Sequence, residues 1–256
     1  MTKTHMDFQE AIRKIEERGD FNRYAEVKPI FADRLEELRP GDHTERGICN
    51  YYLLASYLKA QLVHETAEAI GYYEEMDNSF MLQLAVYREQ TNKFSWSEIQ
   101  DFFRLMERCY GSLEFLYFKH DFKMRKAKAH LRKMEFRKDG YFFNREYWSW
   151  FEYKVLEITS LYTTSIVRWA TTTFLFAAVM ALIYAGMDQV VDESLRTIAA
   201  PAHWYDYIYF SVITMTTVGF GDFVPVFFLA KLAATLEAFL GFLMLGIFIS
   251  LIQKKL

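Results

Sequence analysis

The sequence predicts an all-α protein in which a charged helical body precedes a membrane-spanning module. Charge is distributed unevenly, because the 91 residues from Ile166 to Leu256 carry only 6 acidic and 5 basic side chains, and residues 1–165 carry the other 27 acids and 25 bases. Two long apolar runs lie in the charge-poor part, as membrane spans do. The charge-rich part shows apolar residues at helical spacing and no strand-like alternation.

Composition excludes several other classes of protein. Hydrophobic residues make up 52% of the chain, which excludes intrinsic disorder. Cys49 and Cys109 are the two cysteines, too few for a disulfide scaffold, and we expect both thiols to be reduced core residues. The net charge of −3 argues against nucleic-acid binding. No cleavable secretory signal is found, so residues 1–165 are expected to be cytoplasmic.

Residues 1–140 are expected to form a cytoplasmic helical domain. Phe8, Ile12 and Ile15 lie on one face of a first helix, which Gly19-Asp20 should end. Further helices are predicted at Tyr24–Leu38, Glu45–Leu62, 65–90, 96–118 and 119–138. The segment 119–138 holds nine Lys or Arg against two acids. It is expected to contact anionic lipid or an acidic patch such as Glu65–Glu75, or else to be a solvated helix face.

The stretch AEVKPIFADRLEELRPGDHTERGICNYYLLASYLKA, residues 25–60, resembles the helix–turn–helix of tetratricopeptide repeats. The match covers about one and a half repeats, with no clean ~34-residue period afterwards. Pro29 departs from the pattern, because it should kink its helix. An irregular helical bundle is the alternative. Repeats of this kind would imply a cytoplasmic protein or ligand bound to the domain.

Residues 141–166 are expected to form an aromatic juxtamembrane helix. The segment Tyr147–Tyr153 places five aromatic rings in seven residues just before the first span. Such a helix would lie in the inner membrane interface, where it could pull on a gate. The alternative is that Trp148 and Trp150 are simple membrane anchors.

Two segments are long and apolar enough to cross a bilayer. Trp169–Met187 is free of charge and extends about 28 Å as a helix, close to the ~30 Å hydrocarbon core. Val226–Gln253 is longer and can cross with tilt. Basic residues flank both cytoplasmic ends and the intervening loop is acidic, so both chain termini are expected on the cytoplasmic side of the plasma membrane. Two core helices of a soluble protein are the alternative.

Between the spans, Trp204–Thr216 is about 20 Å long as a helix and therefore too short to cross. The non-helical sequence TVGFGD follows it. Irregular backbone at membrane depth is tolerated only where protein buries it or where it lines a water-filled path. The order of helix, re-entrant helix, loop and helix therefore predicts a pore domain over residues 167–256.

The loop Thr217-Val218-Gly219-Phe220-Gly221 can present a column of backbone carbonyls to one axis, because glycines permit the required conformations. Carbonyl oxygens can replace the hydration shell of a monovalent cation. The negative C-terminal end of the short helix would also favour a cation there. The side chains of Val218 and Phe220 are expected to point away and pack behind the loop.

Residues 214–222, TMTTVGFGD, resemble the signature sequence of potassium channels, and residues 168–253 resemble the two-helix pore module of that family. The resemblance implies a homotetramer in membrane lipid with K⁺ held at Thr217, Val218, Gly219 and Phe220. It implies neither catalysis nor a cofactor, K⁺ being the permeant ion. Phe220 stands where the family usually has tyrosine, which puts the rigidity of the filter in doubt.

Residues around the loop have candidate supporting roles. Tyr209 stands where many family members have tryptophan, and its hydroxyl could hydrogen-bond Asp222 behind the filter, although a solvated outer-mouth acid is the alternative for Asp222. His203 is a candidate external pH sensor or a simple cap neighbour. Glu237, an acid inside a span, is expected to face the pore helix or the cavity, where it could attract cations or hydrogen-bond Thr214 or Thr216. A protonated carboxyl satisfied inside the bundle is the alternative.

Two glycines in the second span mark a candidate gate. Gly241 lies 24 residues after Thr217, where family members have a hinge, and Gly246 lies where the inner helices approach one another. Close helix packing through small residues is the alternative explanation for Gly241.

The sequence therefore predicts a K⁺-selective channel subunit with a TVGFG filter, gated by its N-terminal domain. A membrane-anchored helical-repeat adaptor with a poorly conducting pore is one alternative. A weakly selective monovalent cation channel, permitted by Phe220, is the other.

Overall fold

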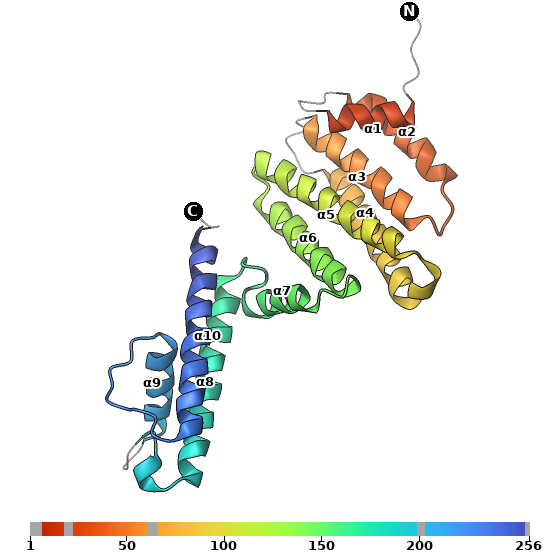
Figure 1. The fold of residues 1–256 in the computed structure, drawn as a ribbon. Helices are drawn as coiled ribbons and strands as arrows, with labels where there is room; N and C mark the ends of the chain where they lie inside the picture. The colour runs from red at the N-terminus through yellow and green to blue at the C-terminus, as the bar shows by residue number, and fades with distance from the viewer. Residues whose placement is uncertain (1–6, 18–22, 61–65, 199–202, 254–256) are drawn as a thin grey trace, which may run out of the picture. The chain divides into compact units, whose positions relative to one another are not determined.

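The computed structural model describes residues 7–17, 23–60, 66–198 and 203–253, which fold into two compact units (Figure 1). The first unit comprises Met1–Trp150 and the second Phe151–Leu256. All regular structure in the described residues is helical, which confirms the predicted all-α class. The division falls inside helix α7, Tyr147–Ser160, within the segment predicted to be the juxtamembrane helix.

Six α-helices build the first unit, and they bear out the predicted helices with small shifts of their ends. Side-chain caps fix two of the starts: the hydroxyl of Thr66 accepts from Ala69 N, and that of Ser95 accepts from Glu98 N. The predicted stop at Gly19-Asp20 lies outside the described residues. The helices are α1 Phe8–Glu16, α2 Tyr24–Glu37, α3 His43–Lys59, α4 Ala67–Glu89, α5 Trp96–Lys119 and α6 Lys123–Phe143.

The last of these helices begins four residues later than predicted. Helix α5 continues to Lys119, and Asp121 then adopts a positive φ of 58° in a tight turn. Aspartate tolerates this left-handed region better than most residues do. The run of basic residues is therefore divided between the end of α5, the turn and α6.

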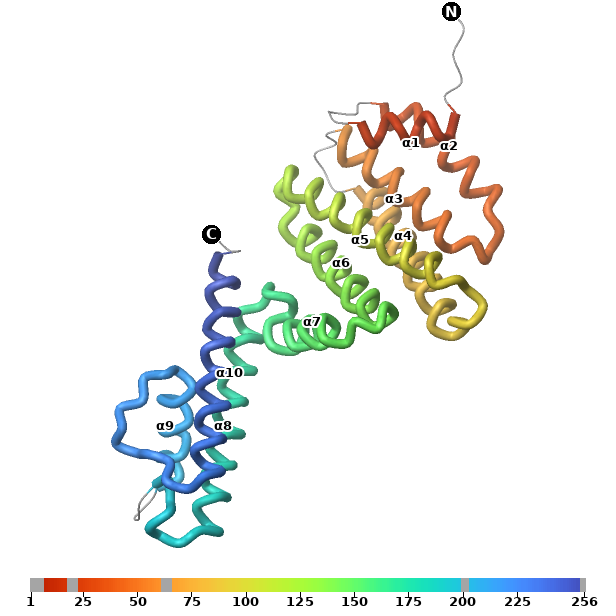
Figure 2. Tube along the Cα trace, viewed as in Figure 1, coloured from red at the N-terminus to blue at the C-terminus, as the bar shows by residue number. Residues whose placement is uncertain are grey.

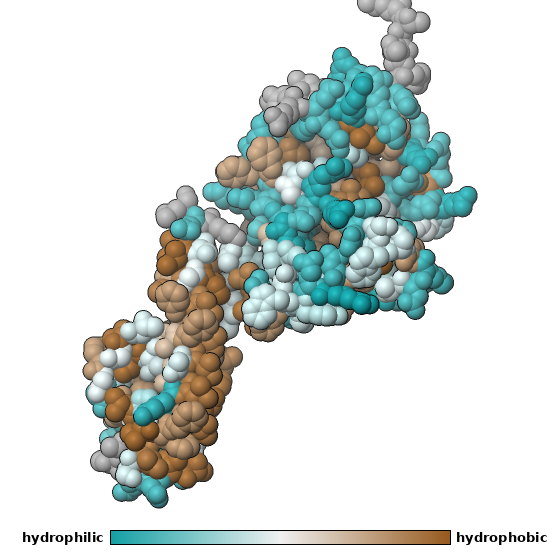
Figure 3. All heavy atoms as spheres, viewed as in Figure 1, coloured by the Kyte–Doolittle hydropathy of each residue, from teal (hydrophilic) through white to brown (hydrophobic). Residues whose placement is uncertain are grey.

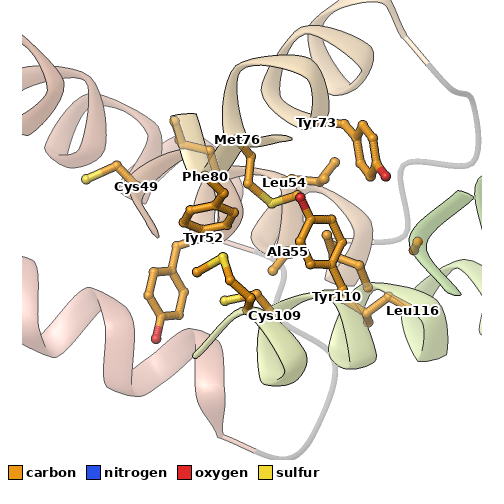
Figure 4. Packing of buried hydrophobic residues seen from close by; sticks show 14 of the residues in the cluster. Cys49, Tyr52, Leu54, Ala55, Tyr73, Met76, Phe80, Cys109, Tyr110 and Leu116 are labelled. Atoms are coloured by element: carbon orange, nitrogen blue, oxygen red, sulfur yellow. The ribbon is translucent and has the colours of Figure 1, made fainter. Parts of the chain in front are cut away.

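An aromatic core fills the first unit between α3, α4 and α5 (Figure 4). Tyr110 and Phe136 stack with their ring centroids 5.5 Å apart. Cys49 and Cys109 are free and buried in this core, as expected. Helices α4 and α5 have 23 and 24 residues, too long for a pair of helices in a ~34-residue repeat. The tetratricopeptide resemblance therefore stays a prediction for α2 and α3 alone.

Several basic side chains of α6 are used inside the first unit. Arg132 pairs with Asp77 at 2.9 Å, and Lys133 pairs with Glu114 at 2.5 Å. Arg137 likewise pairs with Glu107. These acidic partners lie on α4 and α5 outside the predicted patch 65–75, but Lys128 of α6 lies 4.6 Å from the ring of Tyr73 within that segment. Pairing with the acids of the patch stays a prediction. Contact of the remaining basic residues with lipid stays a prediction.

The second unit contains two long apolar helices, α8 (Ile166–Val190) and α10 (Phe228–Gln253), with the short α9 (Trp204–Met215) beside them. Both long helices are long and apolar enough to cross a membrane, and only 22% and 17% of their most apolar windows are buried. The core helix of a soluble protein would be mostly buried, so this finding counts against that alternative. Figure 3 shows the apolar surface over α8 and α10.

Candidate functional site

Helix α9 is anchored on both long helices, and this position determines where the following loop begins (Figure 2). Phe210, Ser211, Ile213 and Met215 form its buried face. The Phe210 ring packs edge-on against Tyr184 of α8, with 4.9 Å between the centroids. The helix ends at Met215 with Thr216 as its C-cap, and the predicted filter, Thr217–Gly221, follows at once.

The filter backbone alternates in the sign of φ. The angle is 58° at Thr217, 50° at Gly219 and 80° at Gly221, and it is not positive at the two residues between them. Glycine adopts positive φ at little cost, which explains two of these positions. Thr217 is β-branched and pays a strain penalty for this conformation. Strain held by surrounding structure is typical of functional sites.

Hydrogen bonds of the filter backbone are one-sided. The N–H of Thr217 donates to Thr214 O at 3.0 Å, and those of Val218 and Gly219 donate to Ile213 O at 3.0 and 3.2 Å. The carbonyl oxygens of 217–221 accept no hydrogen bond from the described residues. Unpaired carbonyls in a membrane protein need partners. Three of the five loop amides are therefore bonded to α9, and all five carbonyl oxygens are available as acceptors.

The side chains of Val218 and Phe220 are 55% and 71% exposed in the single chain. Their packing behind the loop stays a prediction. The buried face of α9 is already occupied by α8 and α10, so no described part of the chain covers the outer side of the loop.

Tyr209 and Asp222 connect the pore helix to the segment after the filter. The Tyr209 hydroxyl donates to Asp222 Oδ2 at 2.8 Å, and Phe223 N donates to Oδ1 at 3.1 Å. The ring of Phe223 lies edge-on to Tyr209 with centroids 6.1 Å apart. These contacts hold the outer end of the loop beside α9.

Glu237 is fully buried, and its predicted partners were wrong. Its carboxyl group contacts the Tyr184 hydroxyl at 2.7 Å and the Ser211 hydroxyl at 2.5 Å. Thr216 instead donates to the Val212 carbonyl of its own helix. The carboxyl group therefore lies between α8, α9 and α10 and not in a cavity.

Ser211 and Tyr184 are the residues that the sequence did not single out. The available signal was that an acid inside a span needs polar partners, and Ser211 and Tyr184 are polar groups in neighbouring membrane segments. Which polar side chains pair with Glu237 depends on contacts between helices that are far apart in the sequence.

The two candidate gate glycines have different surroundings. A Cβ atom added to Gly241 would lie 1.9 Å from the carbonyl oxygen of Met215, the last residue of α9. A Cβ at Gly246 would meet nothing within 4 Å. Helix α10 runs unbroken through both. Close packing against Met215 thus explains why position 241 is a glycine, whereas its role as a hinge stays a prediction.

Trp169 joins the two long helices. Its indole N–H donates to Met244 O at 2.9 Å, and its ring stacks on Phe248 with centroids 4.5 Å apart. His203 is the N-cap of α9, and its backbone N–H donates to Asp206 at 2.8 Å. Its role as a pH sensor stays a prediction.

Residues of the second unit are similar to known ion channels. The family described as "Ion channel" matches residues 168–256. The inward rectifier potassium channel Kirbac3.1 of Paramagnetospirillum magnetotacticum is 39% identical over 78 residues, which are 30% of this chain and 25% of that protein. The two pore potassium channel b of Oryza sativa subsp. japonica is 51% identical over 67 residues, 26% of this chain and 18% of that protein.

These matches cover about a quarter or less of the relatives' own lengths, and no solved structure matches the chain. The matched proteins are ion channels and not enzymes. Helices α8, α9 and α10 and the loop after α9 all fall in the matched range. Residues 168–256 are therefore similar to the ion-channel family, and part of this range is similar to potassium channels.

Proposed function

We propose that the protein is a channel subunit that conducts K⁺ passively through Thr217–Gly221. The observation that carries this proposal is the one-sided hydrogen bonding of the loop. The amides of Thr217, Val218 and Gly219 are bonded to the C-terminal end of α9, and the five carbonyl oxygens of the loop accept no hydrogen bond from the described residues. A backbone that alternates in the sign of φ turns successive N–H groups to one side, so the carbonyl groups lie on the other.

The free carbonyl oxygens supply what a dehydrated K⁺ ion requires. They can replace its hydration shell, and the negative C-terminal end of α9 favours a cation at the same place. One chain supplies one column of oxygens, so several copies must surround the ion. A cyclic homotetramer is the assembly that we propose. The exposure of Val218 and Phe220 supports it, because neighbouring copies would cover these side chains.

The first unit is proposed to be cytoplasmic and to regulate the gate, with the channel in the plasma membrane and both termini inside. Helix α7 carries exposed aromatic side chains, among them Tyr147 and Trp148. Such side chains favour the inner membrane interface.

Flux from liposomes that contain only this protein, under opposed K⁺ and Na⁺ gradients, tests the proposal. A reversal potential near the K⁺ value is expected. A value midway would support the weakly selective channel instead. If there is no flux, removal of residues 1–140 distinguishes a closed gate, which then opens, from a non-conducting adaptor.

A matched pair of variants tests the filter itself. Gly219→Ala forces a side chain into a positive φ of 50° and is expected to abolish selective flux. Gly186→Ala, in α8, meets nothing within 4 Å and is expected to leave flux unchanged. Equal behaviour of the two variants would contradict conduction through this loop.

A further inference from the structure

We infer that Glu237 is a protonated, uncharged carboxylic acid that donates a hydrogen bond to Ser211 and thereby ties α8, α9 and α10 together behind the filter. Glu237, Ser211 and Tyr184 are each fully buried. They come from three helices, so the cluster forms only when the pore helix is seated correctly on both long helices.

The Ser211 hydroxyl has a single proton but two oxygen neighbours, and this supports the inference. The Ser211 hydroxyl oxygen lies 2.8 Å from the backbone carbonyl of Ala177 and 2.5 Å from Glu237 Oε1. A serine hydroxyl has one proton to donate, and a carbonyl oxygen can only accept. Ser211 therefore donates to Ala177 O, and the proton between Ser211 and Glu237 must belong to the carboxyl group.

An ionised Glu237 would leave two oxygens in contact without a proton. Ser211 would then donate to Glu237, and its oxygen would face the Ala177 carbonyl at 2.8 Å with lone pairs opposed. With a protonated acid, every contact has one donor and one acceptor. The chain of bonds runs from the Tyr184 hydroxyl to Oε2, from Oε1 to Ser211, and from Ser211 to Ala177 O.

The charges around Glu237 also favour the neutral form. On α8 the charged side chains are Asp188, whose carboxylate accepts from the amides of Thr197 and Ile198, and Arg168, which donates to Ile158 O. On α9 the acid is Asp206, which caps its own helix, and the tyrosines are Tyr205, Tyr207 and Tyr209. None of these side chains is paired with Glu237.

The only basic side chain of α10 within the described residues is Lys231, which is exposed, and no described Lys or Arg is ion-paired with Glu237. A buried carboxylate without a cationic partner is costly in a membrane. Both the bonding pattern and the charges thus point to the acid form.

The cluster of Glu237, Ser211 and Tyr184 lies next to the start of the filter, so its role in positioning the filter rests on the proposed function. Glu237 contacts Ser211, and one turn further along both helices Gly241 contacts Met215. These two contacts hold the same face of α9 against α10, just before the filter begins. Glu237 is thus a positioning residue for the filter and does not touch the ion.

Infrared difference spectroscopy of the full chain in liposomes tests the protonation state without requiring conduction. The wild-type spectrum at neutral pH, minus that of Glu237→Gln, is expected to show the carbonyl band of a hydrogen-bonded carboxylic acid. Ser211→Ala removes the acceptor and is expected to shift that band to higher frequency. Carboxylate bands in the difference spectrum, or a band that Ser211→Ala does not move, would overturn the inference.

Flux and reversal potential then test the positioning role. Glutamine keeps one donor and one acceptor, so Glu237→Gln is expected to keep selective K⁺ flux, whereas Glu237→Ala is expected to lose it. Loss of selectivity in both variants, or in neither, would overturn the positioning role. If wild type shows the acid band and no K⁺ flux, the proposed function fails while the protonated acid stands.

Discussion

Replacement of Gly241 by alanine separates two explanations of this residue. The new Cβ atom would lie 1.9 Å from the carbonyl oxygen of Met215 and 2.7 Å from its carbonyl carbon. Carbon–oxygen contacts are normally at least about 3.3 Å, so the shortfall is about 1.4 Å. Both atoms at Met215 belong to the backbone, and relief of the clash must therefore displace the end of α9 or the inner helix.

The expected cost follows from that displacement. Overpacking costs about 1–3 kcal/mol where side chains can adjust, and a backbone clash lies at the upper end of this range. Alanine has a better helix propensity than glycine, which stabilises the helix by about 1 kcal/mol and offsets part of this cost. The net of about 2 kcal/mol corresponds to roughly a 30-fold shift away from the intact arrangement of α9 and α10. Since the filter begins two residues after Met215, we expect its selectivity to be lost.

The loss of selectivity in Gly241→Ala is measured as the reversal potential under opposed K⁺ and Na⁺ gradients. The yield of assembled protein is measured alongside it. Gly246→Ala is the matched control, because it makes the same exchange in the same helix and meets nothing within 4 Å. It is expected to keep selectivity and yield. Normal selectivity with a lower open probability in Gly241→Ala would refute the packing explanation and support the hinge.

Two further perturbations address the tether behind the filter and the first unit. Tyr209→Phe removes the hydrogen bond to Asp222 and is expected to lower K⁺ selectivity in the same flux assay; unchanged selectivity would contradict a tether. Burial raises the pKa of Glu114, but hydrogen bonds from His130 and Lys133 outweigh it and hold the pKa at about 2. Its ionised form therefore stabilises the first unit at pH above about 4.5, and up to about 3 kcal/mol is lost as the pH falls toward 2. Circular-dichroism melts should show that Glu114→Gln lacks this pH dependence; a parallel decline in both proteins would contradict it.

Local signals in the sequence were sufficient for the helices. The loop Thr217–Gly221 is a contiguous segment whose glycines permit the positive φ observed at Gly219 and Gly221, whereas the positive φ at Thr217 does not follow from residue type. Apolar runs of membrane length likewise need no knowledge of what packs on them. The start of α6 was misplaced because nothing local distinguishes Asp121 as the site of a left-handed turn.

Contacts between distant segments could not be derived in the same way. Glu237 was recognised as unusual from its type and position, but the choice between Ser211, Thr214 and Thr216 depends on the rotation of α9 against α10. The packing of Val218 and Phe220 behind the loop likewise stays a prediction, because both side chains are exposed in the single chain. Both questions concern packing across elements and leave the local structure intact.

The position of Gly241 and the bonding of Glu237 have a common physical origin. Contacts at successive turns, Glu237 with Ser211 and Gly241 with Met215, require α9 and α10 to run side by side in the same direction. The first contact requires a polar group of the right length, and the second requires that there be no side chain at all. The α9 residues in these contacts, Ser211 and Met215, lie just before Thr217. A rotation of α10 that opened a gate would therefore have to break both contacts or move α9 with it. Movement of the inner helix is therefore expected to begin beyond Gly241, toward Gly246, where the surroundings are open.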